Sequence, residues 1–141
     1  YFEHPAITTD VIVGFPGETQ EEFETTRAFI EKVGFYETHV FKYSRRNGTK
    51  AASMPDQVPE QKKAERSQIL LDLCKKKKKE FEDQMIGKQV EVLLEETFEK
   101  DGVLYRTGLT KEYVKVAVKA DNTRENQILE MTIENHSQIM D

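Results

Sequence analysis

Residues 9–19 read TDVIVGFPGET and combine a strand, a tight turn and a helix start. The apolar run over residues 7–15 is nearly continuous, which is typical of a parallel strand that is buried on both faces. A Pro-Gly pair ends the strand, and Thr19 with Glu22 predicts the capping box of a helix. Proteins of the α/β class present the carboxyl end of a strand to a ligand through such a turn.

A second strand is expected over residues 37–43, and the intervening helix is expected to end at Gly34. The two strands and the helix form a β–α–β unit, in which the strands should pair in parallel. The block FKYSRRNGT at residues 41–49 therefore ends at the same edge of the sheet as the Gly14–Thr19 turn.

The middle of the chain predicts a loop followed by a long helix. Residues 44–58 show little periodicity, and Pro59 opens a helix that extends to about Met85. Lys75–Lys79 is an unbroken run of five lysines within this helix. Because five successive helical residues point all around the axis, we interpret the run as a solvated surface rather than an RNA site.

After Gly87 the pattern changes to short alternating strands. Apolar residues alternate with polar ones in several segments, and the sequence at residues 100–102 favours a hairpin turn. Four or five short strands within 55 residues predict a small β-barrel. The expected fold class is therefore α/β followed by β, with the helix over residues 59–85 as the boundary.

The charge balance does not favour binding of nucleic acid over the whole surface. The net charge is −5, and residues 86–141 carry 7 basic against 11 acidic side chains. RNA contacts would therefore depend on local patches.

The single cysteine, Cys74, excludes an internal disulfide and a multi-cysteine metal site in this chain. No apolar run approaches the ~20 residues of a membrane span, so we expect no membrane contact and a cytoplasmic location.

Two segments could bind a ligand. Glycines at Gly14–Thr19 let backbone N–H groups approach a ligand, although the same turn could be selected for its geometry alone. Tyr43, Arg45 and Arg46 could stack a base and bind phosphate, or form a solvated loop. The three histidines lack the spacing of metal ligands, and we find no convincing nucleophile–base pair or carboxylate dyad. We therefore predict no catalytic residue and no metal site in this chain.

Three blocks of the sequence resemble the radical SAM methylthiotransferase family. Residues 7–19 are similar to its fifth barrel strand, and residues 41–59 with Glu65-Arg66 are similar to its sixth strand and the following segment. Residues 87–141, with the motif Gly108-x-Thr110-x-x-Tyr113-Val114, are similar to the TRAM domain, an OB-like RNA-binding β-barrel. The resemblance covers essentially the whole chain.

Within this family, the block HVFKYSRR at residues 39–46 is most similar to the threonylcarbamoyladenosine tRNA methylthiotransferases. The isopentenyladenosine-tRNA and ribosomal-protein branches come next. The implied reaction adds a methylthio group at carbon 2 of a modified adenosine beside the tRNA anticodon. It requires S-adenosylmethionine and two 4Fe–4S clusters, whose cysteine ligands are absent from this chain.

The resemblance implies roles for individual residues. In the family's Gly-x-Ile-x-Gly-x-x-Glu pattern, Asp10 replaces the first glycine and Glu18 comes one residue late. Cofactor contacts are expected at Ile12, Val13, Gly14 and Phe41. RNA contacts are expected at Tyr43, Arg45, Arg46, Lys88, Arg106, Lys111 and Lys115.

The chain opens with Tyr1 rather than Met, and we expect it to be part of a longer protein. Residues 1–58 would be the last part of a radical SAM barrel, residues 59–85 a connecting helix and residues 86–141 the TRAM domain. We expect the chain to be inactive alone and to self-associate through the open edges of its unfinished barrel. The alternatives are a non-enzymatic RNA-binding module and an unrelated phosphate-binding α/β domain.

Overall fold

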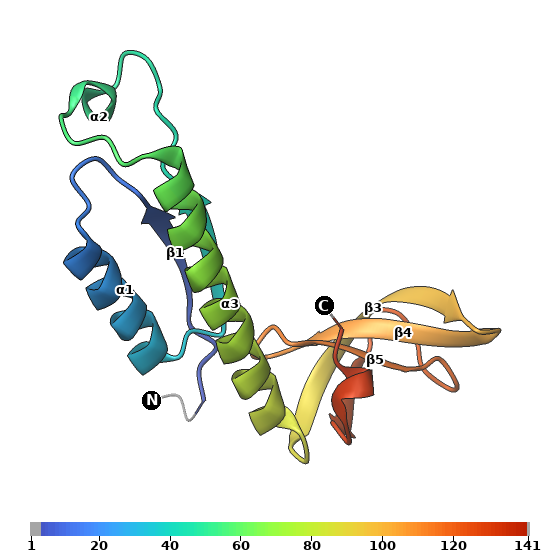
Figure 1. The fold of residues 1–141 in the computed structure, drawn as a ribbon. Helices are drawn as coiled ribbons and strands as arrows, with labels where there is room; N and C mark the ends of the chain where they lie inside the picture. Colours follow the sequence, from blue (N-terminus) through green and yellow to red (C-terminus); the bar gives the residue numbers. More distant parts are fainter. Residues whose placement is uncertain (1–3, 141) are drawn as a thin grey trace. The chain divides into compact units, whose positions relative to one another are not determined.

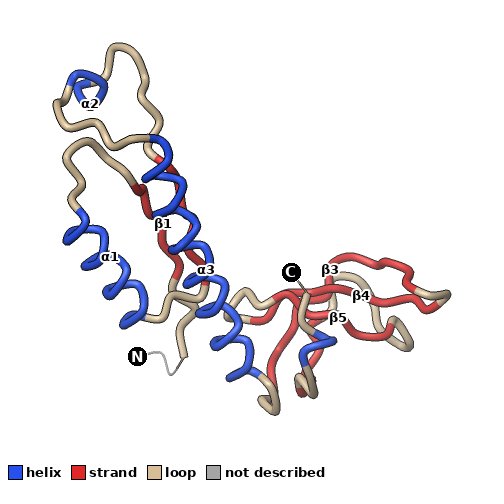
Figure 2. The backbone as a smooth tube through the Cα atoms, in the orientation of Figure 1, coloured by secondary structure: helices blue, strands red, loops and turns tan. Residues whose placement is uncertain are grey.

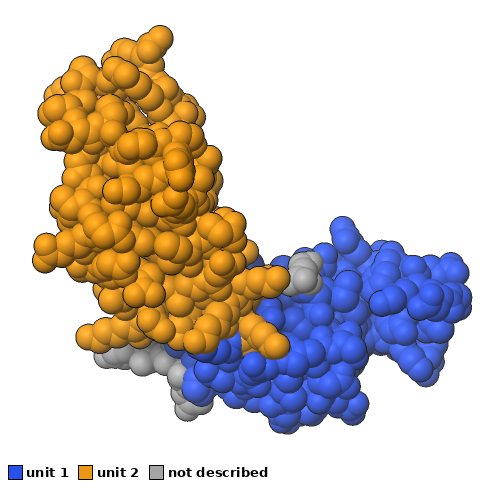
Figure 3. All heavy atoms as spheres, in the orientation of Figure 1, with its two compact units in different colours: residues 1–5, 80–141 blue, residues 6–79 orange. Residues whose placement is uncertain are grey.

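The computed structural model describes residues 4–140 and divides into two compact units (Figure 3). One unit comprises residues 6–79, and the other comprises residues 80–141 with the first five residues. The long helix α3 (Glu60–Met85) therefore contributes most of its length to the first unit. No helix among the described residues is long and apolar enough to cross a membrane.

The first unit contains the predicted β–α–β arrangement. Strands β1 (Thr8–Val13) and β2 (Glu37–Lys42) pair in parallel, with helix α1 (Gln20–Val33) between them in sequence (Figures 1 and 2). A short helix, α2 (Lys50–Ser53), interrupts the segment that the sequence predicted as a loop. The Thr49 side chain caps α2 by accepting a hydrogen bond from the Ala52 N–H, 3.2 Å away.

Both predicted ends of α1 are confirmed. The Thr19 hydroxyl accepts a hydrogen bond from the Glu22 N–H, and the Glu22 carboxylate accepts one from the Thr19 N–H at 2.8 Å. These bonds lower the pKa of Glu22, so their contribution to stability is lost as the pH falls through that lowered value. At the other end Gly34 adopts φ 68°, and its N–H donates to the Ile30 carbonyl.

The core of the first unit lies on one face of the two-stranded sheet. Its buried members come from β1, α1, the segment before β2, and α3: Val13, Phe23, Ile30, Phe35, Leu70 and Cys74. On the other face, Ile12 and Phe41 are 55% and 52% exposed. The prediction that residues 7–15 are buried on both faces is therefore wrong for this chain, because its helices cover only one side.

The second unit is an antiparallel sheet with the strand order β5-β4-β3-β6. Its elements are β3 (Gln89–Lys100), β4 (Val103–Thr110), β5 (Lys115–Lys119), β6 (Ile128–Thr132) and the 3₁₀-helix η1 (His136–Gln138). The predicted hairpin turn is confirmed, because Asp101 and Gly102 both have positive φ between β3 and β4.

The predicted barrel appears as a curled sheet that wraps a small core. Val90, Val92, Leu94 and Val116 are buried on the strands, and Val114 and Ile133 are buried directly beside β5 and β6. Gly108 permits a close crossing of β3 and β4, because a Cβ there would lie 2.3 Å from the Leu93 carbonyl oxygen. A bridge between Val116 and Ile139 brings the segment after η1 against β5.

Burial raises the pKa of the Cys74 thiol, although a hydrogen bond with Thr38 acts in the opposite direction. We predict that this thiol reacts slowly with a disulfide reagent in the native chain at neutral pH, because little thiolate is present and access is restricted. Labelling should become fast in 6 M urea. Rapid labelling without denaturant would contradict the packing of α3 against the sheet.

Candidate functional site

The turn after β1 is held closed by the chain's own side chains. Gly14 has φ 71°, and its N–H donates a 2.7 Å hydrogen bond to Oε2 of Glu18. The same carboxylate oxygen lies 2.5 Å from a guanidinium nitrogen of Arg66. The Glu18 carboxylate therefore accepts the hydrogen bond of the Gly14 N–H, which the sequence predicted for a ligand. A cofactor could contact Gly14 only through its other atoms.

Arg66 links the turn to helix α3. Its side chain is only 3% exposed, and it also donates to the Glu18 carbonyl at 3.0 Å. Its guanidinium lies 5.3 Å from the ring centroid of Phe23, a core residue of α1. Arg66 thus connects β1, α1 and α3 at the carboxyl end of the sheet.

Lys63, one turn earlier on α3, packs over Gly14. A Cβ on Gly14 would lie 2.2 Å from Cγ of Lys63. The Lys63 ammonium donates to the Tyr43 carbonyl at 3.0 Å and pairs with Glu60 at 3.1 Å. Sequence reasoning missed both Lys63 and Arg66 as site residues, although their spacing extends the buried face of α3 backward from Leu70.

The expected cofactor residues do not share one face. Ile12 and Phe41 are register partners on the open face of the sheet. Asp10 and His39 are register partners on the same face, one step further from the carboxyl end. Val13 points the other way and is fully buried, so only its backbone could contact a ligand.

The segment after β2 divides into a packed residue and two exposed ones. The ring of Tyr43 lies edge-on to Phe15 with 5.3 Å between the centroids, and Lys63 lies over its face. Its hydroxyl is buried without a hydrogen-bond partner in the described structure. Arg45 and Arg46 are exposed, as an RNA contact requires.

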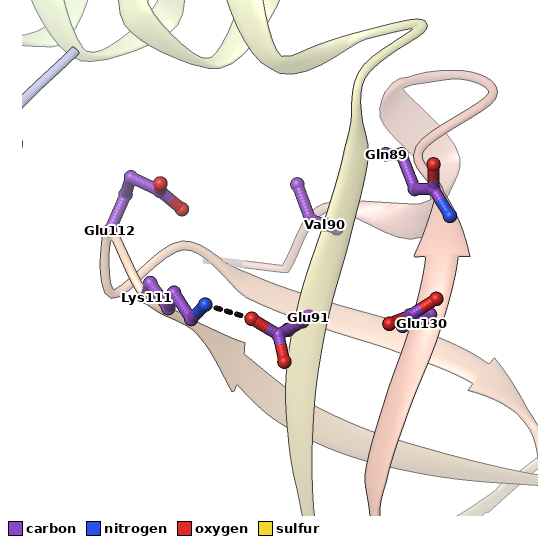
Figure 4. A pocket seen from close by; sticks show the side chains of 6 residues that line it. All are labelled: Gln89, Val90, Glu91, Lys111, Glu112 and Glu130. Carbon is purple, nitrogen blue, oxygen red and sulfur yellow. Dashed lines mark ion pairs between the residues drawn. The ribbon is translucent and has the colours of Figure 1, made fainter. Parts of the chain in front are cut away.

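The four cations expected to contact RNA in the second unit are dispersed. Lys111 forms an ion pair with Glu91 in a pocket of about 370 Å³ that also contains Glu112 and Glu130 (Figure 4). Arg106 donates to the Thr97 hydroxyl at 3.0 Å and lies 3.5 Å from Glu125. Lys88 and Lys115 are half-buried. The structure therefore does not gather these residues into one basic patch.

No metal site is present among residues 4–140, where no three His, Cys, Asp or Glu side chains come together in a suitable cluster.

Comparison with known proteins identifies homologues over most of the chain. It is 47% identical over 116 residues to a tRNA-2-methylthio-N(6)-dimethylallyladenosine synthase of Acetivibrio thermocellus, covering 82% of the chain and 24% of that protein. It is 43% identical over 129 residues to a threonylcarbamoyladenosine tRNA methylthiotransferase of Bacillus subtilis, covering 91% of the chain and 29% of that protein. The chain thus spans about a quarter of the length of these relatives. No family model matches it.

The first prediction from this geometry compares two glycines with positive φ. Gly17→Ala should cost about 1 kcal/mol, because only backbone strain opposes it. Gly14→Ala should cost about 2 kcal/mol more, because the new methyl group overlaps Lys63. Urea denaturation measures both changes. Lys63→Ala should recover part of the loss in the Gly14→Ala background, and equal costs for the two glycine variants would contradict this packing.

The second prediction concerns the buried ion pair. Arg66→Met should destabilise the chain by about 3 kcal/mol, because it leaves the Glu18 carboxylate buried without its partner. The matched control is Arg27→Met, which removes an exposed ion pair with Glu24 and should cost less than about 1 kcal/mol. Similar denaturation midpoints for the two variants would exclude the organising role of Arg66.

Proposed function

This chain belongs to the radical SAM methylthiotransferase family, and we propose that it forms part of an enzyme that modifies tRNA. The observation that carries the proposal is the identity of 40–47% to tRNA methylthiotransferases over 82–92% of the chain. The complete enzyme would add a methylthio group to carbon 2 of an adenosine beside the anticodon. A cytoplasmic location follows from that substrate.

Within this proposal, the chain contributes one wall of the cofactor site rather than the reactive centre. Its single cysteine cannot hold a 4Fe–4S cluster, and Cys74 is buried in the core of the first unit. Bound S-adenosylmethionine would supply a radical in the complete enzyme. The exposed side chains of Ile12 and Phe41 offer adjacent apolar surface for its adenosine.

We place the tRNA contacts of the first unit at Arg45 and Arg46. Both are exposed in the segment that follows β2, at the carboxyl end of the parallel strands. Guanidinium groups there could bind phosphates of an anticodon arm. Phe41, on the open face, would lie toward the modified base.

The proposed substrate is N6-threonylcarbamoyladenosine, which is supported by the block HVFKYSRR at residues 39–46. A relative named for this nucleoside and a relative named for the dimethylallyl nucleoside, which is the isopentenyl form, have similar identities to the chain, 43% and 47%. The isopentenyladenosine and ribosomal-protein branches are the alternatives within the family. A non-enzymatic RNA-binding module is the alternative outside it.

The proposal is tested by expressing the complete protein in a bacterial strain that lacks its own tRNA methylthiotransferases. Nucleosides from its tRNA should contain the 2-methylthio form of N6-threonylcarbamoyladenosine by mass spectrometry, whereas the 141-residue chain alone should produce none. Double substitution of Arg45 and Arg46 by Ala should lower the yield and the tRNA affinity, and Arg27→Ala serves as the exposed-arginine control.

Two results would reject parts of this proposal. Methylthiolation of the isopentenyl nucleoside alone would transfer the enzyme to the other tRNA branch. A reading frame upstream of Tyr1 without a Cys-x-x-x-Cys-x-x-Cys motif would favour the RNA-binding module, because no cluster could then be held.

A further inference from the structure

The loop between β4 and β5 carries an exposed aromatic residue in a strained conformation. Tyr113 has φ 63° and is 74% exposed. A bulky side chain is rare in this left-handed region, which glycine and asparagine adopt far more readily. Such outliers persist where the surrounding structure fixes them, and they gather at ligand sites.

The backbone of this loop is fixed by Thr110. Its N–H donates to the Val114 carbonyl at 3.0 Å, and its carbonyl accepts from the Tyr113 N–H at 3.0 Å. Its hydroxyl accepts from the N–H groups of Glu112 and Val114, both at 3.2 Å. The buried Val114 side chain anchors the loop. All of these bonds would also form with a glycine at position 113, so the fold of the loop does not require a tyrosine ring there.

The ring borders an apolar pocket on the exposed face of the sheet. The pocket has a volume of about 390 Å³, and its apolar lining consists of Leu93, Leu109, Tyr113 and Ile128. Leu93 lies opposite Leu109 on one neighbouring strand and opposite Ile128 on the other. Three aliphatic side chains from three strands therefore form a continuous apolar surface beside the tyrosine.

The rim of this pocket carries more acidic than basic side chains. Lys111 pairs with Glu91, and both line the pocket together with Glu95. Lys115 lies opposite Leu109, and its position places it at the same face. Glu112 and Glu130 line the neighbouring pocket that shares Glu91 and Lys111, so acidic side chains outnumber the two lysines around this surface. Such a surface suits the flat, uncharged ring of an unpaired base better than a run of phosphates.

We propose that Tyr113 and its three aliphatic neighbours stack an unpaired base of tRNA, with Lys111 and Lys115 beside its backbone. The inference rests on the proposed function, and it deepens that function by naming the RNA-binding face of the second unit. Base stacking on aromatic residues tolerates any base, so this surface contributes affinity rather than sequence choice.

The test measures binding of a fluorescent tRNA to the 141-residue chain by anisotropy. Tyr113→Gly should weaken binding by roughly tenfold, as expected for one lost stacking contact. Its melting temperature should be no lower than that of the parent chain, because the substitution removes backbone strain. Tyr113→Phe should retain the parental affinity. The matched control is Asn122→Gly, which relieves the same positive φ elsewhere and should leave binding unchanged.

A second measurement separates stacking from charge. Since Tyr113→Gly removes no charge, the affinity ratio of parent to Tyr113→Gly should stay constant as salt rises, although both affinities fall. An affinity for Tyr113→Gly equal to the parent's would overturn the inference while leaving tRNA as a partner. A dimer that Tyr113→Gly dissociates without affecting tRNA binding would also overturn it, in favour of a second copy on this surface.

A lower melting temperature of Tyr113→Gly would assign the ring a structural role and would likewise overturn the inference. Absence of any tRNA binding by the parent chain would overturn both this inference and RNA binding by the chain. The parent measurement therefore distinguishes a failure of the partner from a failure of this surface.

Discussion

The first unit depends on one buried ion pair, in which Arg66 of helix α3 holds the Glu18 carboxylate against the N–H of Gly14. Charged groups enter a protein interior only when they are paired and hydrogen-bonded, so this contact fixes the geometry of every group that it joins. It sets the turn after β1, the start of α1 and the position of α3. A helix distant in sequence thereby packs against the carboxyl end of the sheet.

This arrangement gives the two faces of the sheet different roles. The helices cover one face and produce the core around Val13 and Leu70, whereas Ile12 and Phe41 remain uncovered on the other. Parallel sheets are normally covered on both faces, so the open face is the surface on which further structure or a ligand would lie. The second unit covers its core differently, by curling an antiparallel sheet around several valines, Leu94 and Ile133.

Local sequence signals predicted the elements well because their causes are local. The capping box at Thr19 and Glu22, the Gly34 cap and the Asp101-Gly102 hairpin each depend on residues within one turn of each other. The short helix α2 was missed because its four residues carry too little periodicity to be recognised. The sequence also predicted correctly that Gly14 lies in a turn. It did not predict that the Gly14 N–H binds Glu18, because that contact depends on Arg66 of α3.

The amino-acid sequence by itself determined the β–α–β order, the alternating strands of the second unit and the family resemblance, since these follow from spacing and local chemistry. Only the tertiary structure decided which side chains share a surface. It covered Val13 with the helices and left Ile12 exposed on the other face, and it paired Lys111, just after β4, with Glu91 of β3. It also exposed Tyr113 beside Leu93, because strand register, which is set by non-local pairing, brings these residues together.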